Sequence, residues 1–406
     1  MAMRVTNSAL YRQYTTSVND VHSQLNKSMN KISSGKAYES AAENPLAYYS
    51  GQRMDTDYRD VLSKKTLLTD IDKRLNQQEM GVRSLQSTLA TGQDNAASRI
   101  SYILNSTNNE TSTTVGTIRD DLIQKQQSMV NNLNSKYESF YVFGGNDLTT
   151  TPFSISYDSD TNDMVLTYTH KFSGDDKATE FKFKMVEDGG EYCFKLQPPA
   201  AGGTGKEDEQ HLLLAMSEQG RVDIGYGSIH DTKTLIDTYN GGLNVLTGIT
   251  SDAIRTGNYK LADIEKAMTN SALGLTGQGV ITMNKYMTYL DNDRTIDATP
   301  DATGGAISID KAEFQEKLGK ISSEIQITSD KLGNIYSNIG NKTNQLETTL
   351  SRLEDEKLAL ETQYADKLGA DPYDSIVEMF AHQRSYYASL QVSSNIMRMS
   401  LFDFMG

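Results

Sequence analysis

The sequence predicts a mainly α-helical protein with an inserted β-rich domain. Its long helices are expected to form an antiparallel bundle, and its N- and C-terminal helices are expected to pair as a coiled coil. Two runs of apolar residues at a strict spacing of seven, and one region of alternating apolar residues, support this prediction. A spacing of seven places one apolar stripe along a helix that packs lengthwise against other helices. Alternation in steps of two is typical of strands with one buried face.

The longest heptad pattern predicts a single helix from Leu318 to Leu360. At 1.5 Å per residue this helix would be roughly 65 Å long, which suits a strut in a bundle or an assembly better than the wall of a compact active site. Additional apolar residues, three or four positions away, complete the seam. The heptad residues are Leu318, Ile325, Leu332, Ile339, Leu346, Leu353 and Leu360.

A second heptad pattern predicts a partner helix over about residues 46–103. A polar loop over residues 105–114 then turns the chain back into a third helix, predicted for residues 115–140 with Phe140 on its inner face. Residues 46–140 are therefore expected to form a long helical hairpin. The second heptad consists of Val61, Leu68, Leu75, Val82 and Leu89.

The period changes from seven to two after residue 146. Four alternating runs, at 153–157, 164–168, 181–185 and 192–196, are separated by turns rich in Asp, Asn and Gly, and they predict a small antiparallel β unit. Weaker apolar patterns then predict three helices, over residues 235–246, 254–268 and 283–290. A polar stretch at 291–305 precedes the long helix.

The two ends of the chain each carry a narrow apolar stripe. The first helix is expected to stop at Gly35 in a left-handed C′ position, and a break at residues 368–372 precedes the last helix. Stripes this thin cannot bury a core alone, so we expect the ends to pair with each other and with neighbouring copies, building a tube. The predicted assembly interface consists of Val18, Val21, Leu25, Ile32, Ile376, Phe380, Tyr387, Leu390, Met397 and Leu401.

These patterns predict three domains. The terminal assembly domain comprises residues 1–45 plus 372–406, and the helical bundle domain comprises residues 46–150 plus 276–371. The outer β-rich domain, residues 151–275, is an insertion at the tip of the bundle.

Composition excludes several classes of protein. The net charge of −14 disfavours nucleic acid as a partner, because phosphates would be repelled. No apolar run approaches the ~18 residues of a membrane helix, so we expect no membrane insertion. The start of the sequence lacks the apolar core of a secretory signal, which predicts a cytosolic protein or one exported without cleavage. The single cysteine, Cys193, excludes an internal disulfide framework.

No residue constellation predicts catalysis, a metal site or a cofactor. The histidines, at 22, 170, 211, 230 and 382, lack ligand spacing. The stretch 158–169 begins like a calcium loop but lacks the glycine and the final glutamate, so a hairpin turn is the better interpretation. The stretch 301–314 lacks the inner acidic ligands of an EF-hand, and Gly277-Gln278-Gly279 alone cannot cradle a phosphate. We therefore expect neither an enzyme nor a bound cofactor.

Several motifs resemble the axial proteins of the bacterial flagellum, the superfamily of flagellin and the hook-associated proteins. The run Leu25–Lys36, followed by Glu43–Pro45, resembles the N-terminal signature of flagellin-type chains. The segment Tyr141-Val142-Phe143-Gly144-Gly145-Asn146 with Thr151–Phe153, and the end Ser400–Met405, are similar to the hook–filament junction family called hook-associated protein 3. The resemblance covers residues 1–153 and about 310–406.

The resemblance implies a structural role without catalysis. A member of this family would form a ring at the hook–filament junction and connect hook-associated protein 1 to the flagellin filament. The implied partners are other copies of the chain, hook-associated protein 1, flagellin, and a flagellar export chaperone with the export apparatus. The protein would be extracellular, and its flagellin-like terminal helices would form an inner coiled-coil tube.

Three alternatives remain open from the sequence. A divergent flagellin would share the terminal helices, although flagellin generally lacks the Phe-Gly-Gly segment. A cytosolic coiled-coil scaffold or chaperone would also show heptads. An enzyme housed in residues 154–300 would require a polar-lined cleft in that region.

Overall fold

The protein is described from a computed structural model. The structure describes the backbone of residues 7–405 except 39, 107–109, 199–204, 218–219, 224–234, 238–239 and 258. Side chains are described over the same residues except 7–11, 205–208, 221, 223, 235–236 and 393–405. The chain divides into two compact units. We call Met1–Leu67 with Leu350–Gly406 the terminal unit, and Leu68–Thr349 the central unit.

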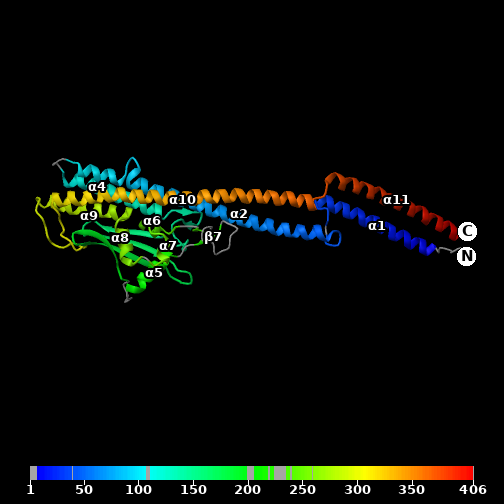
Figure 1. The fold of residues 1–406 in the computed structure, drawn as a ribbon, viewed down its shortest axis with the longest axis horizontal. Coiled ribbons are helices and arrows are strands. Elements are labelled where there is room, and N and C mark those ends of the chain that lie inside the picture. The colour runs from blue at the N-terminus through cyan, green and yellow to red at the C-terminus, as the bar shows by residue number, and fades with distance from the viewer. Residues whose placement is uncertain are drawn as a thin grey trace. The chain divides into compact units, whose positions relative to one another are not determined.

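The terminal unit contains two pairs of helices. Helices α1 (Asn7–Ser34) and α11 (Pro372–Met405) lie side by side (Figure 1). The first part of α2 (Pro45–Gln86) and the last part of α10 (Lys311–Leu368) also belong to this unit. Helix α1 ends as predicted, because Gly35 has a φ of 68° and its N–H donates to the Lys31 carbonyl at 2.9 Å.

The two heptad patterns lie on α2 and α10, which run antiparallel. Within the central unit, Gln86 Nε2 donates to the Ser329 carbonyl at 2.8 Å, and the Arg83 guanidinium lies 5.2 Å from the Tyr336 ring centroid. Six of the seven residues of the first heptad are buried and Leu360 is half-buried, and all five residues of the second heptad are buried. The predicted seam is confirmed.

The central unit adds further helices to this pair. Helix α9 (Ala272–Asp291) packs against α4 (Ser112–Leu133), and residues 272–286 are buried without interruption. A helix buried on all sides occupies the interior of a domain. Glycines allow this close packing, since a Cβ at Gly277 would lie 2.3 Å from Met164 Sδ. The sequence predicted only the last turns of α9, because its first half has no polar face.

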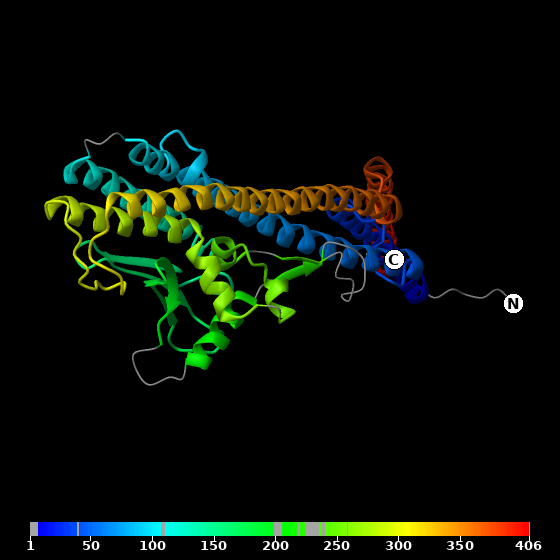
Figure 2. The same cartoon turned by 60° about the vertical axis from the view of Figure 1, so that its left-hand side comes forward.

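The four alternating runs form one antiparallel sheet in the order β3-β4-β5-β6, as predicted. Its strands are β3 (Phe153–Asp158), β4 (Asp163–His170), β5 (Thr179–Asp188) and β6 (Glu191–Leu196). The sheet lies on one side of α4 and α9 (Figure 2). The apolar members of each strand are mostly buried, and the intervening Ser, Thr and Lys residues lie on the other face.

Shorter elements complete the central unit. They are η1 (Ser87–Thr91), α3 (Ala96–Leu104), β1 (Lys136–Tyr137), β2 (Phe140–Tyr141), α5 (Gly205–Ser217), β7 (Arg221–Asp223), β8 (Leu235–Asp237), α6 (Gly242–Thr247), α7 (Ser251–Arg255) and α8 (Leu261–Thr269). Strand β1 pairs with β2 and β7 pairs with β8, both antiparallel.

The prediction of one helix over residues 46–103 is wrong at its end. Helix α2 ends at Gln86, a π-helical turn follows, and α3 starts at Ala96. Asn95 causes the new start, because its side chain accepts from the Ser98 N–H at 2.7 Å and donates to the Ala90 carbonyl at 2.9 Å.

The third predicted helix also ends early, at Leu133 instead of Phe140. Both polar groups of the Asn134 side chain pair with the backbone of Phe153, at 2.7 and 2.9 Å, which joins the helix end to strand β3. The chain then forms the β1–β2 turn, and Phe140 is exposed.

Two predicted helices between residues 235 and 268 are wrong in extent. The first is replaced by strand β8 and helix α6, while Tyr239 lies outside the described residues. Gly242 starts α6 where a Cβ would lie 2.3 Å from the Phe153 ring. The second is split into α7 and α8 by Gly257, which has a φ of 71°.

Candidate assembly surface

Helices α1 and α11 form an antiparallel pair, and polar contacts join the two helices near both ends of the described pairing. Lys31 Nζ lies 3.3 Å from Glu378 Oε2, and the Tyr14 hydroxyl donates to the Ser389 carbonyl. Between these contacts, the ring centroids of His22 and Tyr386 lie 5.4 Å apart. As residue numbers rise on α1 they fall on α11, so the pair is antiparallel.

The face of α1 that contacts α11 contains predicted interface residues. Val18, Val21 and Leu25 are half-buried, whereas Ile32 is exposed. The spacing from Tyr14 through Val18, Val21 and Leu25 alternates between four and three residues, which is the spacing of a helix-pairing seam.

The face of α11 in this pair is not the apolar stripe. Ser375 is buried, and Met379, His382, Tyr386 and Ser389 are half-buried. They repeat at alternating steps of four and three, so they form the α11 side of the seam. The sequence analysis did not predict this seam, because serine and histidine are not counted as apolar residues. The alternating spacing of four and three residues is nevertheless present in the sequence.

The apolar stripe of α11 points away from the seam. Phe380 is 52% exposed and Tyr387 is 61% exposed, and Ile376 and Leu390 are also exposed. Tyr373 and Val377, which the sequence prediction did not include, extend the same exposed surface. The side chains of Met397 and Leu401 lie outside the described residues. Thus, among the predicted interface residues that the structure describes, Val18, Val21 and Leu25 lie within the α1–α11 pair, whereas Ile376, Phe380, Tyr387 and Leu390 are exposed.

The terminal unit has a second apolar feature, a groove between α2 and α10. Met54, Tyr58, Leu360 and Tyr364 lie along this groove, which has a volume of about 310 Å³. All four side chains are half-buried, whereas Val61 and Leu353 nearby are buried. Two helices cannot enclose their own seam, so its apolar residues remain partly exposed here.

The Phe-Gly-Gly segment, which carries part of the family resemblance, is fixed to α2 in the central unit. The Phe143 ring is buried, and a Cβ at Gly81 would lie 2.7 Å from it. Buried Gln78 donates to the Val142 carbonyl at 2.8 Å and accepts from the Asn240 N–H at 3.0 Å. The segment therefore anchors the exit from the helices to the sheet.

A cluster of buried charges joins the sheet to α9 and α10. Lys285 is 0% exposed, and its Nζ lies 2.7 Å from Glu187 Oε2 and 3.2 Å from Asp301 Oδ2. Lys317 Nζ donates to the other oxygen of Glu187 at 2.7 Å and lies 4.3 Å from the Tyr192 ring centroid. We call Lys285, Glu187, Asp301, Lys317 and Tyr192 the charge cluster.

The electrostatics of this cluster favour the ionised carboxylate. Burial alone would raise the pKa of Glu187, but hydrogen bonds from Lys285 and Lys317 and their charges outweigh it, and the pKa is lowered. A carboxyl with a lowered folded pKa stabilises the fold above its unfolded pKa. That contribution is lost as the pH falls through the folded pKa. This contribution of Glu187 is therefore fully present at neutral pH.

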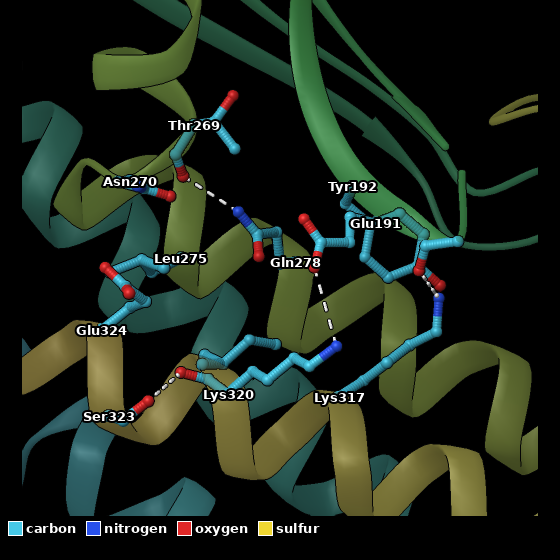
Figure 3. A pocket seen from close by; sticks show the side chains of 12 residues that line it. Glu191, Tyr192, Thr269, Asn270, Leu275, Gln278, Lys317, Lys320, Ser323 and Glu324 are labelled. Carbon is cyan, nitrogen blue, oxygen red and sulfur yellow. Dashed lines mark hydrogen bonds and ion pairs between the residues drawn. The ribbon is translucent and has the colours of Figure 1, made fainter. Parts of the chain in front are cut away.

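A small pocket lies beside this cluster (Figure 3). Its volume is about 240 Å³, and its lining combines Leu275 and Ile321 with polar side chains. Lys320 reaches toward Glu191, with 3.6 Å between the charged atoms, and Gln278 Nε2 donates to the Thr269 carbonyl at 2.9 Å. The polar side chains that line the pocket therefore pair with other residues of the protein. We interpret them as contacts between the sheet turn, α9 and α10.

The sequence stretches considered for metal binding have structural roles. Asp158 Oδ1 accepts the Asp160 N–H at 3.0 Å within the β3–β4 turn, and Asp301 belongs to the charge cluster. His170 is buried against Phe172, whereas His230 lies outside the described residues. In the described part of the chain, no three His, Cys, Asp or Glu residues are placed to hold a metal ion. Among the same residues, no helix is long and apolar enough to cross a membrane.

Comparison with known proteins gives matches only among solved structures. No protein-family model and no curated protein matches the chain. It is similar to a "putative flagellar hook-associated protein" from Vibrio parahaemolyticus, with a TM-score of 0.46 and 12% identity over 80% of this chain and 100% of that chain. It is also similar to FlgL from Bacillus cereus, with a TM-score of 0.36 and 14% identity over 79% of this chain and 100% of that chain.

Proposed function

We propose that this chain is a structural subunit of the bacterial flagellum. It forms the ring at the hook–filament junction and connects hook-associated protein 1 to the flagellin filament. The terminal helices α1 and α11 form a coiled coil that assembles with those of neighbouring copies. The chain reaches this extracellular position through the flagellar export apparatus, assisted by an export chaperone, and it catalyses no reaction.

The exposed apolar stripe of α11 carries the proposal. Phe380 and Tyr387 remain more than half exposed although α11 already has a helical partner in α1. Exposed apolar side chains gathered on one helix face are typical of a surface that another protein covers. A terminal helix with a free apolar face suits a subunit that is completed by its neighbours.

The family resemblance supports the choice of location. The Phe-Gly-Gly segment and the sequence Ser400–Met405 are similar to the junction family rather than to flagellin. In the central unit this segment packs against Gln78 and Gly81 of α2, which gives it a defined structural role at the exit to the sheet. The proposal keeps the three domains predicted from the sequence, with the β-rich domain, residues 151–275, inserted at the tip of the bundle.

Labelling of detached flagella tests the location directly. An antibody against the central unit is expected to mark one narrow band where hook and filament meet, because a junction ring occupies a single position. Label along the whole filament would instead identify a flagellin, and label confined to the cytosol would contradict both.

Phe380→Asp is expected to abolish assembly while leaving the isolated subunit folded. Because Phe380 is exposed, the change in unfolding free energy should stay within about 0.5 kcal/mol. A charge on a surface that becomes buried between copies costs several kcal/mol. Sedimentation measures self-association, and thermal unfolding measures the fold. Tyr102→Asp, at a 63% exposed site on α3, is the matched control and should assemble normally. If the Phe380→Asp monomer is unfolded, or if the Phe380→Asp variant assembles normally, the proposed role of the stripe is wrong.

A further inference from the structure

Lys285 of α9 and Asp301, in the connection between α9 and α10, form an ion pair that is shielded from water. The Lys285 side chain is 0% exposed and the Asp301 side chain is 1% exposed, and Lys285 Nζ lies 3.2 Å from Asp301 Oδ2. A nitrogen held against a carboxyl group in one fixed geometry replaces the encounter of two separate reactants. These two groups are the reactants from which an amide bond forms.

Three donors hold the Asp301 carboxyl group in one orientation. Its Oδ1 accepts the Thr303 N–H at 2.9 Å and also the Thr303 hydroxyl, and its Oδ2 accepts from Asn162 Nδ2 at 3.0 Å. Donors aimed at a carboxyl oxygen stabilise the negative charge that collects there when a nucleophile adds to the carbon. Oδ1 is therefore the oxygen that would carry this charge, and Oδ2, next to Lys285, is the oxygen that would leave.

Glu187 is placed to transfer protons from the lysine. Its Oε2 accepts from Lys285 Nζ at 2.7 Å, and its Oε1 accepts from Lys317 Nζ at 2.7 Å. A carboxylate within hydrogen-bond distance of a nucleophilic nitrogen can act as a general base. The contact with Lys317 fixes its orientation. The chain also approaches it closely at Gly305, where a Cβ would lie 1.7 Å from Oε2.

Backbone hydrogen bonds fix Glu187 and Asp301 relative to each other. The Glu187 N–H donates to the Thr303 carbonyl at 2.7 Å, and the Asp301 N–H donates to the Gly305 carbonyl at 2.9 Å. The turn that contains Asp301 is therefore tied to the end of β5. The geometry of the two carboxyl groups depends on the backbone and not on the lysine that lies between them.

We propose that Lys285 and Asp301 become joined by an amide bond after the chain has folded. Lys285 Nζ bonds to Asp301 Cγ, and the bond between Cγ and Oδ2 breaks. Two protons of the ammonium pass through Glu187 to Oδ2, which leaves as water, and the third stays on the amide nitrogen. One ammonium and one carboxylate thus become a neutral amide and water, and no other reactant is needed.

The ion pairs of the charge cluster are the state from which this bond forms. The amide closes a loop between α9 and the connection that leads to α10, and a closed loop has fewer conformations in the unfolded chain. The reaction takes place once in each chain and consumes no separate substrate. This inference goes beyond the proposed function and does not depend on it.

Mass spectrometry of the purified full-length chain tests the bond. We expect the intact mass to be lower than the mass of the sequence by one water molecule. Trypsin cleaves after Arg294, between the joined residues, but not after an acylated Lys285. The digest should therefore contain residues 267–294 linked to residues 295–311. An intact mass without this loss overturns the proposal, and so does loss of water confined to the unlinked peptide 295–311.

Glu187→Gln tests the transfer of protons, because glutamine keeps a similar volume but cannot act as the base. Samples taken from a cell-free synthesis reaction and stopped in urea give the linked fraction against time. We expect the bond to form at least about 100-fold more slowly than in the parental chain. Lys320→Met, a change at the nearby surface pair with Glu191, is the matched control and should form the bond at the parental rate.

Formation of the bond at the parental rate in Glu187→Gln would overturn the role of Glu187. Circular dichroism of the purified variant checks that it is folded. If it is not folded, the mass of the parental chain decides the proposal, because that measurement needs no substitution. Lys285→Met removes the ion pairs and the amide together, so its stability does not distinguish the two states and only the mass does.

Discussion

Lys285→Met is expected to lower the free energy of unfolding of the protein by about 3–5 kcal/mol, because it removes a buried cation and leaves its carboxylate partners in place. The ammonium lies 2.7 Å from Glu187 Oε2 and 3.2 Å from Asp301 Oδ2, and the side chain is 0% exposed. Methionine keeps a similar volume, so the loss reports the charge rather than a cavity. Urea unfolding followed by circular dichroism measures it.

Lys320→Met is the matched control for this experiment. Lys320 pairs with Glu316 and Glu191 at the surface, where ion pairs contribute about 0–1 kcal/mol. The control should therefore unfold at nearly the parental urea concentration. Equal stability of Lys285→Met and Lys320→Met would show that the buried cluster does not hold the sheet turn, α9 and α10 together.

Leu346→Asp is expected to unfold much of the helical pair in the central unit. Leu346 is completely buried at a heptad position of α10. The substitution removes the apolar contacts of a core leucine, about 2–5 kcal/mol, and places an unpaired carboxylate where water is excluded, at a further cost. Because small domains have only about 5–15 kcal/mol of net stability, this one change removes a large part of it.

Asn344→Asp provides the comparison for Leu346→Asp. It introduces the same carboxylate two residues away, at an exposed position of the same helix. Its effect should stay within about 0.5 kcal/mol. Helicity measured against temperature separates the two variants. If Leu346→Asp and Asn344→Asp unfold at the same temperature, the α2–α10 seam is not a core of the fold.

The sequence predicted the helices and strands whose burial follows a regular period. The heptads on α2 and α10 and the alternation in β3–β6 required only local spacing. The predictions were wrong where a single polar or glycine residue redirects the backbone. Asn95 starts a new helix after the π-helical turn, and Asn134 ties a helix end to Phe153. These contacts join side chains to backbone groups outside the periodic pattern.

The candidate assembly surface was likewise predicted only in part from the sequence. The sequence predicted the apolar stripe of α11 and assigned it to an assembly interface. It did not reveal that α1 packs against the adjacent seam of Ser375, Met379, His382, Tyr386 and Ser389, leaving the stripe exposed. The residues of the seam and those of the stripe are offset by one position along α11. A prediction based on hydrophobicity alone therefore places the more apolar stripe, and not the seam, against α1.

Local periodicity by itself predicted the long heptad helices and the four strands β3–β6, because backbone geometry repeats with the spacing of apolar residues. Only the tertiary structure decided which face of each helix is covered and which charges are buried. The local sequence does not distinguish Lys285 from a surface lysine. Its side chain is nevertheless buried in the central unit, where it pairs with Glu187 and Asp301 from distant segments of the chain. Contacts of this kind depend on three-dimensional proximity, for which a local pattern holds no information.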